Sequence, residues 1–159
     1  MVSLFTRPRR FGKTLNMDML RVFFEKTNED TSVYFKDKQI WQCGDYYTKH
    51  QGQYPVIFLT FKDVKSMTWE ETFQKIRRLI SLEFIRHNEL ETSSALTSYE
   101  KEQYHLLAGD SGDEVDCQMG LQLLSLLLHK HMEGNVSLSL MNMTHPSNRG
   151  IPAISIRKL

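Results

Sequence analysis

Three consecutive residues, Gly12, Lys13 and Thr14, have the types and the order that phosphate binding requires. Glycine lets backbone N–H groups converge on a phosphate where a Cβ would intrude, and a lysine can reach the terminal phosphates. A threonine hydroxyl at the start of a helix can contact Mg²⁺. The sequence therefore predicts a nucleotide-phosphate site in which Lys13 is the catalytic residue and Thr14 is the metal contact.

The flanking segments have the character of a strand and a helix, which is the context that such a loop needs. Residues 2–6 form a short apolar, β-prone run, and Pro8 and Gly12 then forbid regular structure. From Lys13 to about Lys26 the apolar residues recur at spacings of three and four, which predicts a helix. The standard loop pattern would place a second glycine at position 7, where this chain has Arg7.

The other residues of the loop allow more than one interpretation. Arg7, Arg9 and Arg10 could each pair with a phosphate in bidentate geometry, or face solvent, or form ion pairs elsewhere, and we expect one of them to contact the nucleotide. Phe11 could stack on a base, but we expect it to pack beneath the loop. The predicted nucleotide contacts are Arg7, Pro8, Arg9, Arg10, Phe11, Gly12, Lys13, Thr14 and Leu15.

The remaining chain alternates between strand-like and helix-like segments. Residues 54–61 are continuously apolar, as in a strand covered on both faces, and Thr68 has the type and position of a helix N-cap. The further predicted elements are a helix to about residue 87, a polar loop around 89–97, a helix from 98 to about 108, a turn at 112–116 and a Leu-rich helix over 120–131. This order favours an α/β fold with parallel strands.

Composition excludes several classes of protein. The 159 residues suit one domain, and 20 basic against 19 acidic residues give a net charge of +1, which disfavours a nucleic-acid binder. No apolar run approaches the roughly 18–20 residues that cross a bilayer, so no membrane partner is expected. Cys43 and Cys117 lack metal or disulfide-scaffold spacing, which indicates a reducing, cytoplasmic location.

Other reactive side chains give weaker signals. His129 and His131 are two residues apart and so face different sides of a helix, and the histidines interpreted as isolated are His50, His87 and His105. Cys117 has no basic neighbour that would favour its thiolate. The arginines on one helix edge, interpreted as a solvated face, are Arg77, Arg78 and Arg86.

Two blocks of the chain resemble the AAA-ATPase-like family. The string from Leu4 to Met17 contains R-P-R-R-F-G-K-T and resembles the family signature R-P-R-R-F-G-K-S/T, which lacks the first glycine of the standard loop. The segment from Tyr54 to Lys65, followed by Trp69 and Glu70, is similar to the second block. The resemblance covers about residues 2–134, and it implies an incomplete P-loop α/β domain with helices flanking a parallel sheet, binding ATP with Mg²⁺.

The chain departs from this family where an acidic strand is expected. P-loop enzymes place Asp or Asp-Glu at the end of an apolar strand, to hold Mg²⁺ through water and to position the attacking water. The resemblance implies this strand directly after the Leu-rich helix, yet no acidic residue follows Glu133. We therefore expect an ATPase domain with impaired hydrolysis. The alternative is a non-enzymatic fragment that acts as a nucleotide-binding or protein-interaction module, with no partner identified.

The codons of this region can restore the missing motif. Met141 is ATG, Asn142 is AAT or AAC, Met143 is ATG and Thr144 begins with AC. A shifted reading frame can start at the last base of the Leu140 codon. In that frame the second triplet is GAA, which encodes Glu, and the fourth is GAC, which encodes Asp. The shifted frame allows Asp-Glu-Tyr-Asp-Thr-Pro, which is similar to the motif of the family.

We therefore expect two segments of different origin. Residues 1–134 are predicted to be the AAA-ATPase-like P-loop domain, and residues 135–159 an out-of-frame, disordered tail. Met1 lies directly at the first predicted strand, so the domain is also expected to lack its N-terminal part.

Overall fold

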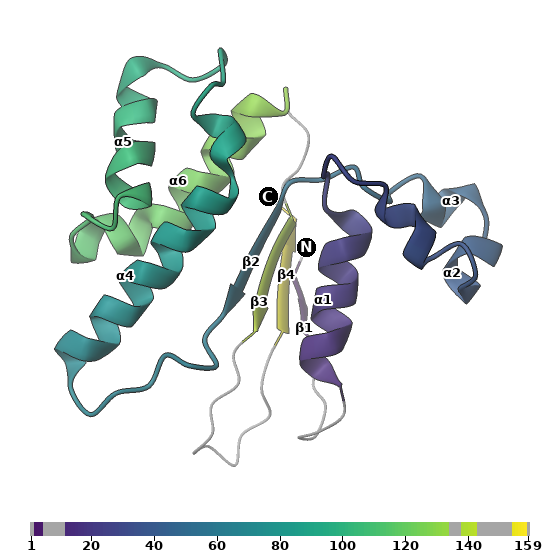
Figure 1. Ribbon diagram of the computed structural model, residues 1–159, viewed down its shortest axis with the longest axis horizontal. Coiled ribbons are helices and arrows are strands. Elements are labelled where there is room, and N and C mark those ends of the chain that lie inside the picture. The colour runs from purple at the N-terminus through teal and green to yellow at the C-terminus, as the bar shows by residue number, and fades with distance from the viewer. Residues whose placement is uncertain (1, 5–11, 134–137, 143–153, 159) are drawn as a thin grey trace. The chain divides into compact units, whose positions relative to one another are not determined.

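Two compact units make up the chain (Figure 1). The computed structural model describes residues 2–4, 12–133, 138–142 and 154–158. The first unit comprises residues 1–58 and 136–159, and the second comprises residues 59–135.

A sheet carries both ends of the chain. Its strands, in the order β1-β4-β3-β2, are β1 (Val2–Leu4), β4 (Ile154–Lys158), β3 (Leu138–Asn142) and β2 (Val56–Thr60). β4 is antiparallel to both neighbours, so that Ile156 lies opposite Ser3 on one side and Leu140 on the other. These two pairs therefore differ from the parallel sheet that the sequence predicted. Because β1 and β3 both run opposite to β4, they run in the same direction as each other.

Both β3 and β4 fall within residues 135–159, where the sequence predicted a disordered tail. The structure gives two five-residue segments of this tail strand conformation. Both sequences contain apolar and polar residues, a mixture that is typical of strands with one covered face. They are L-S-L-M-N and I-S-I-R-K. The reading frame that encodes them stays a prediction.

Helix α1 (Lys13–Phe24) confirms the helix predicted after the glycine. Met17 of α1 and Val56 of β2 are fully buried, and three apolar residues, Leu20, Phe24 and Phe58, pack around them. Burying side chains of this size contributes about 1.5–3 kcal/mol each. This contact fixes the orientation of α1 against the start of β2.

The C-terminal end of α1 is tied to the segment before β2 by backbone hydrogen bonds. Glu25 and Tyr54 form an isolated parallel bridge, in which Tyr54 N donates to Phe24 O at 2.9 Å and Lys26 N donates to Tyr54 O at 2.9 Å. The Tyr54 hydroxyl also hydrogen-bonds to Nδ1 of His50. His50, interpreted from the sequence as isolated, therefore belongs to this junction.

Three short helices between α1 and β2 were not predicted. They are η1 (Thr31–Tyr34), α2 (Gln39–Gln42) and α3 (Asp45–Thr48). The Asp30 side chain caps η1 by accepting from Ser32 N at 3.0 Å, and the ring of Phe35 packs edge-on against Phe23 at 5.1 Å. Helices of four residues leave no apolar periodicity in the sequence, which is why pattern analysis misses them.

The second unit is built from helices. They are α4 (Trp69–Arg86), η2 (Asn88–Leu90), α5 (Ser98–Ala108) and α6 (Glu114–His131). α4 packs against both α5 and α6, and α5 packs against α6. The fully buried core includes Phe84 from α4 and Leu124, Leu127 and Leu128 from α6. Two hydroxyls add hydrogen bonds between helices: Ser81 Oγ donates to Ala108 O at 2.7 Å, and Tyr104 Oη donates to Phe84 O at 3.2 Å.

Side-chain caps define where these helices begin. Thr68 accepts from Glu71 N at 3.3 Å, which confirms the predicted start of α4. Residues 112–116, predicted to be a turn, are instead divided between a cap and the first turn of α6. Asp113 accepts from Asp116 N at 2.8 Å while Asp116 accepts from Asp113 N at 3.0 Å, a reciprocal pair that starts the helix at Glu114.

The cap at α5 can be tested by removing one hydroxyl. Thr97 Oγ1 accepts from Glu100 N at 3.3 Å, and Glu100 Oε2 accepts from Thr97 N at 2.9 Å. Because Thr97→Ala leaves a first-turn N–H without its partner, we expect it to lower the free energy of unfolding by about 1 kcal/mol in urea denaturation. Ser98→Ala, at the next and exposed position, is the control and should change it by much less. Equal losses from both variants would contradict the assigned cap.

Candidate functional site

Gly12 occupies the N-cap of α1 with a left-handed backbone. Its φ is 68° and its ψ is 21°, and its carbonyl accepts the first helical hydrogen bond from Asn16 N at 2.8 Å. A Cβ built at Gly12 would meet no atom within 4 Å, so the torsion angle rather than crowding requires glycine. The predicted glycine is therefore present at a turn that feeds directly into a helix.

The start of α1 has the features that favour an anion. No side chain caps it, and its first turn has no acidic residue. The N–H groups of a first turn point out along the helix axis, at the positive end of the helix dipole. Thr14 is exposed and the side chain of Leu15 is 64% exposed, so this end of α1 is open to solvent.

The structure describes part of the predicted binding segment. Gly12 is the cap, Lys13 is the first residue of α1, and Thr14 and Leu15 follow in the same turn, so these four lie together. β1 precedes them and gives the predicted order of strand, loop and helix. The predicted contacts outside the described residues are Arg7, Pro8, Arg9, Arg10 and Phe11, together with the side chain of Lys13.

The strand β3 occupies the position in the chain at which the acidic strand was expected. β3 follows α6 along the chain and packs beside α1 in the first unit. Its residues, from Leu138 to Asn142, include no carboxylate. Within the described ranges, no group of three or more His, Cys, Asp or Glu side chains is placed to hold a metal ion. The described part of the predicted site therefore consists of the Gly12 turn and the first turn of α1, which includes Thr14.

Thr60, the last residue of β2, carries a polar group that the sequence analysis did not single out. Its Oγ1 is buried and makes no hydrogen bond in the described structure. An unpaired buried hydroxyl costs about 1–3 kcal/mol. The sequence shows that a polar residue ends an otherwise apolar strand. It does not show whether the hydroxyl of that residue forms a hydrogen bond.

His87 is the centre of a buried ionic cluster and is not isolated, as the sequence suggested. The residue is 4% exposed, at the C-terminal end of α4. Its Nδ1 lies 3.0 Å from Glu89 Oε1, and its Nε2 lies 3.6 Å from Glu83 Oε1. Arg86 Nη2 donates to the same Glu83 oxygen at 2.6 Å. Burial closes this cluster to ligands, so we assign it to the joint between α4 and η2.

The two carboxylates decide the charge of His87. Burial alone lowers the pKa of His87, but the hydrogen bonds with Glu83 and Glu89 outweigh it and raise the pKa above the ordinary value of 6.5. Burial also acts to raise the pKa of Glu89, and the hydrogen bond with His87 reverses this and lowers it. The joint is therefore most stable when the imidazolium and both carboxylates are charged together.

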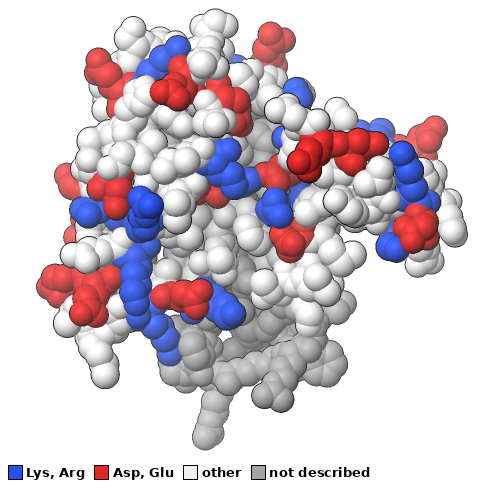
Figure 2. All heavy atoms as spheres, in the orientation of Figure 1, with Lys and Arg blue, Asp and Glu red and all other residues white. Residues whose placement is uncertain are grey.

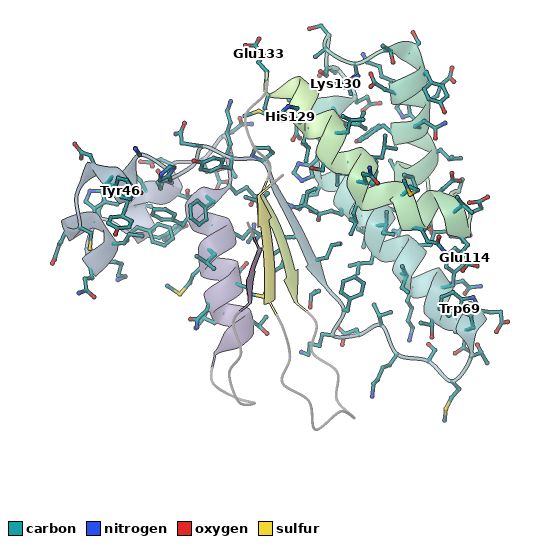
Figure 3. All side chains as sticks on the ribbon, turned by 180° about the vertical axis from the view of Figure 1, so that it is seen from behind. Tyr46, Trp69, Glu114, His129, Lys130 and Glu133 are labelled. Atoms are coloured by element: carbon teal, nitrogen blue, oxygen red, sulfur yellow. The ribbon has the colours of Figure 1, made fainter. Side chains whose placement is uncertain are left out.

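A serine and a histidine meet at the same end of the helical unit, where His131 also acts electrostatically on Glu89. His131 Nδ1 lies 2.9 Å from Ser93 Oγ, which also accepts from Ala95 N at 3.3 Å. Ser93 is only 4% exposed, so its hydroxyl is placed to fasten a loop to α6 and not to attack a substrate. His129 is exposed near the end of α6 (Figure 3).

Two of the three arginines on this edge of α4 form ion pairs with other described residues. Arg77 Nε donates to Asp110 at 3.0 Å and Arg86 pairs with Glu83, whereas Arg78 is exposed. Arg77 and Arg86 therefore stabilise the unit, which corrects the interpretation of all three as solvated. Burial raises the pKa of the Cys117 thiol, in agreement with the expectation that it is not a reactive thiolate.

Comparison with known proteins gives one match. Residues 1–124 match the sequence model of a family described as a predicted AAA-ATPase, a span that includes the whole of α1 and most of the second unit. No curated protein and no solved structure matches the chain. Within the described residues, no helix combines the length and the apolar character needed to cross a bilayer.

The charge of His87 can be measured through stability. A raised pKa means that its stabilisation is complete below the unfolded value and is lost as the pH rises through the folded value. The gap in unfolding free energy between the wild-type protein and His87→Gln should therefore shrink as the pH rises from about 6.5, the ordinary pKa of histidine, through the higher folded-state pKa. The exposed His129→Gln should give no such gap. A gap for His87→Gln that is constant with pH would contradict a charged imidazolium.

Replacing the unpaired hydroxyl of Thr60 should stabilise the protein. Thr60→Val replaces the hydroxyl by a methyl group of similar size, so it should raise the free energy of unfolding by about 1 kcal/mol in urea denaturation. Thr48→Val, at a half-buried threonine in α3, controls for the change in composition. A loss of stability at position 60 would mean that Oγ1 has a partner.

Proposed function

The chain belongs to the AAA-ATPase-like family, and we propose that it binds ATP with Mg²⁺ at the start of α1. The observation that carries this proposal is the left-handed Gly12 directly before Lys13 and Thr14. N–H groups in the first turn of a helix have no partner within the helix, so a phosphate can accept hydrogen bonds from them. Glycine, lysine and threonine then supply the turn, the cation and the hydroxyl in that order.

Each residue has one proposed role. Lys13 contacts the β- and γ-phosphates, and the backbone from Arg10 to Thr14 surrounds them. The hydroxyl of Thr14 would hold Mg²⁺, which when bound neutralises part of the phosphate charge. The open first turn fits these ligands, because no acidic side chain opposes the phosphates there.

The basic loop before Gly12 is proposed to complete the contacts. One of Arg7, Arg9 and Arg10 pairs with a phosphate, while Phe11 packs beneath the loop. Guanidinium groups suit this role because their fork of N–H donors matches two phosphate oxygens at once.

Hydrolysis by this chain is proposed to be slow or absent. β1 and β3 run in the same direction, so the carboxyl end of β3 lies at the edge of the sheet where the loop to Gly12 begins. Ligands of open α/β sheets bind at the carboxyl ends of strands, which makes this edge the place for a carboxylate. The chain has Met141 and Asn142 there, and neither can serve as a base for water.

We attribute the absent carboxylate, and the antiparallel β4, to a shift of reading frame near residues 134–136. The in-frame parent would then be an ATPase with a parallel sheet. Both cysteines are free thiols in the described structure, which fits the cytoplasmic location that we propose.

A second candidate is a non-enzymatic fragment without a working nucleotide site, and it follows from the same missing carboxylate. A thermal melt separates the two. Ligand at 100 times its Kd stabilises a folded site by about 2.7 kcal/mol, so Mg-ATP should raise the Tm of a binding domain. A melt that Mg-ATP leaves unchanged favours the second candidate.

Loss of the Lys13 ammonium should weaken ATP binding. A charge-assisted hydrogen bond contributes about 1.5–3 kcal/mol, so Lys13→Ala should raise the Kd for Mg-ATP by about tenfold to a hundredfold in isothermal titration calorimetry. Lys26→Ala, just beyond the far end of α1, is the matched control and should bind as the wild-type protein does. Equal Kd values for Lys13→Ala and wild type would count against the site.

The frame shift makes a prediction about nucleic-acid sequence. In the gene, the frame that includes the last base of the Leu140 codon as its first position should encode an apolar run that ends in Asp-Glu. Correcting the frame should give a protein that releases phosphate from ATP, while the present sequence should release it at the background rate. A shifted frame without that acidic pair would remove this explanation.

A further inference from the structure

Asp18 is the only acidic residue of α1, and it lies one turn after Thr14. Residues four apart lie on the same side of a helix, with their Cβ atoms about 5–6 Å apart. The Cα–Cβ bond of a helical residue also tilts toward the N-terminus, so that of Asp18 tilts toward the turn that contains Thr14. The Asp18 side chain is 50% exposed and Thr14 is exposed, so solvent reaches both residues. Figure 2 shows charged side chains of both signs on the surface over α1.

Arg21 holds one oxygen of the Asp18 carboxylate and leaves the other. Its Nε and Nη2 both donate to Asp18 Oδ1, at 3.0 Å and 2.9 Å. Arg21 is itself fixed, because its Nη1 donates to the buried Glu25 at 2.7 Å and its guanidinium lies 5.6 Å from the ring centroid of Phe58. Among the described residues, no group donates a hydrogen bond to Asp18 Oδ2. Asp18 therefore presents an oriented carboxylate oxygen that has no partner in the described part of the chain.

The spacing of Thr14 and Asp18 suits an Mg²⁺ ion that Asp18 contacts through water. Mg²⁺ prefers oxygen ligands and keeps several of its waters when it binds a protein. A hydroxyl-bound Mg²⁺, one of its waters and a hydrogen bond from that water together span about 5–7 Å. This span matches one helical turn, since four residues advance about 6 Å along the axis. A carboxylate one turn after Thr14 is therefore within reach of a water on the Mg²⁺ that Thr14 would hold.

We propose that Asp18 is a positioning residue for Mg²⁺, and that its Oδ2 accepts a hydrogen bond from a water of the ion that Thr14 would hold. This role rests on the proposed nucleotide site and deepens it, because it assigns a carboxylate to the metal in a chain whose β3 has none. Outer partners of this kind orient the ligands of a metal ion. Asp18 gives the ion a partner on α1, while Arg21 balances the charge of the carboxylate.

The charge of Asp18 should act in opposite directions on the two forms of ATP. Metal-free ATP is strongly anionic, and a carboxylate near its phosphates repels it. A bound Mg²⁺ reverses the sign of this interaction, because the carboxylate then faces a divalent cation. An ion pair that only stabilises α1 would instead influence the binding of both forms equally. The difference between the two forms therefore distinguishes the proposed role from a structural one.

Isothermal titration calorimetry with ATP, once in excess Mg²⁺ and once in EDTA, tests this role. Asp18→Asn keeps the size of the side chain and an oxygen for Arg21 but removes the charge. We expect it to raise the Kd for Mg-ATP by roughly tenfold, as the loss of a group that orients metal ligands does, and to leave the Kd for metal-free ATP unchanged or lower. Glu25→Gln removes the other carboxylate bound to Arg21 and is the matched control, and its Kd for Mg-ATP should equal that of the wild type.

The outcomes separate this role from the proposed function. A wild-type protein that binds no ATP removes the nucleotide site itself, whereas equal binding of Mg-ATP by the wild type and Asp18→Asn overturns only the role of Asp18. An equal rise of both Kd values in Asp18→Asn would mean that its pair with Arg21 only stabilises α1. The same loss of Mg-ATP binding in Glu25→Gln would assign the effect to Arg21, and this comparison decides if metal-free ATP binds too weakly to measure. Far-UV circular dichroism checks folding, and Asp18→Ser replaces Asp18→Asn if the latter unfolds.

Discussion

The backbone of one residue, Gly12, determines whether this chain can form a phosphate site. A φ of 68° is a left-handed conformation that costs an ordinary residue roughly 1–2 kcal/mol and costs glycine little. Because the chain turns at this angle, α1 begins at once with Lys13, and Thr14 lies in its first turn. The torsion angles of Gly12 therefore place the lysine and the threonine of this sequence in the first turn of α1. This helix end is exposed, and no side chain among the described residues caps it.

A phosphate site also needs a rigid base, and the opposite side of α1 provides it. Met17 is buried against Val56, and Arg21 links Asp18 to Glu25 while its guanidinium lies over the ring of Phe58 at 5.6 Å. These contacts hold the middle and the end of the helix and leave its start for a ligand. The same sheet brings β3 beside α1, so the chain retains the position of an acidic strand without the acid. The proposed nucleotide binding and the proposed hydrolysis of the parent protein therefore depend on different parts of the chain.

Local signals in the sequence predicted the elements that local interactions form. The three- and four-residue apolar spacing gave α1, the Thr68 cap gave α4, and continuous apolar residues gave β2. The start of α6 was missed because the reciprocal Asp113–Asp116 cap has the composition of a turn. Contacts between distant residues left no local signal: His87 with its carboxylates depends on the path taken after α4, and the antiparallel β4 depends on pairing across more than 150 residues. The sequence analysis assigned Gly12 to the loop because a Cβ would intrude there, whereas the structure shows that the left-handed torsion angle, not crowding, favours glycine.

The most direct test of the account is a titration of ¹⁵N-labelled protein with Mg-ATP, followed by backbone amide chemical shifts. We predict that the amides of Gly12, Lys13 and Thr14 move most and saturate together with a single Kd, since their N–H groups are proposed to face the phosphates. Gly12→Val, which disfavours the left-handed backbone, should abolish these shifts while leaving the amides of α4 to α6 in their folded positions. Shifts confined to other segments, or unchanged amides at the start of α1 under saturating Mg-ATP, would contradict the central claim.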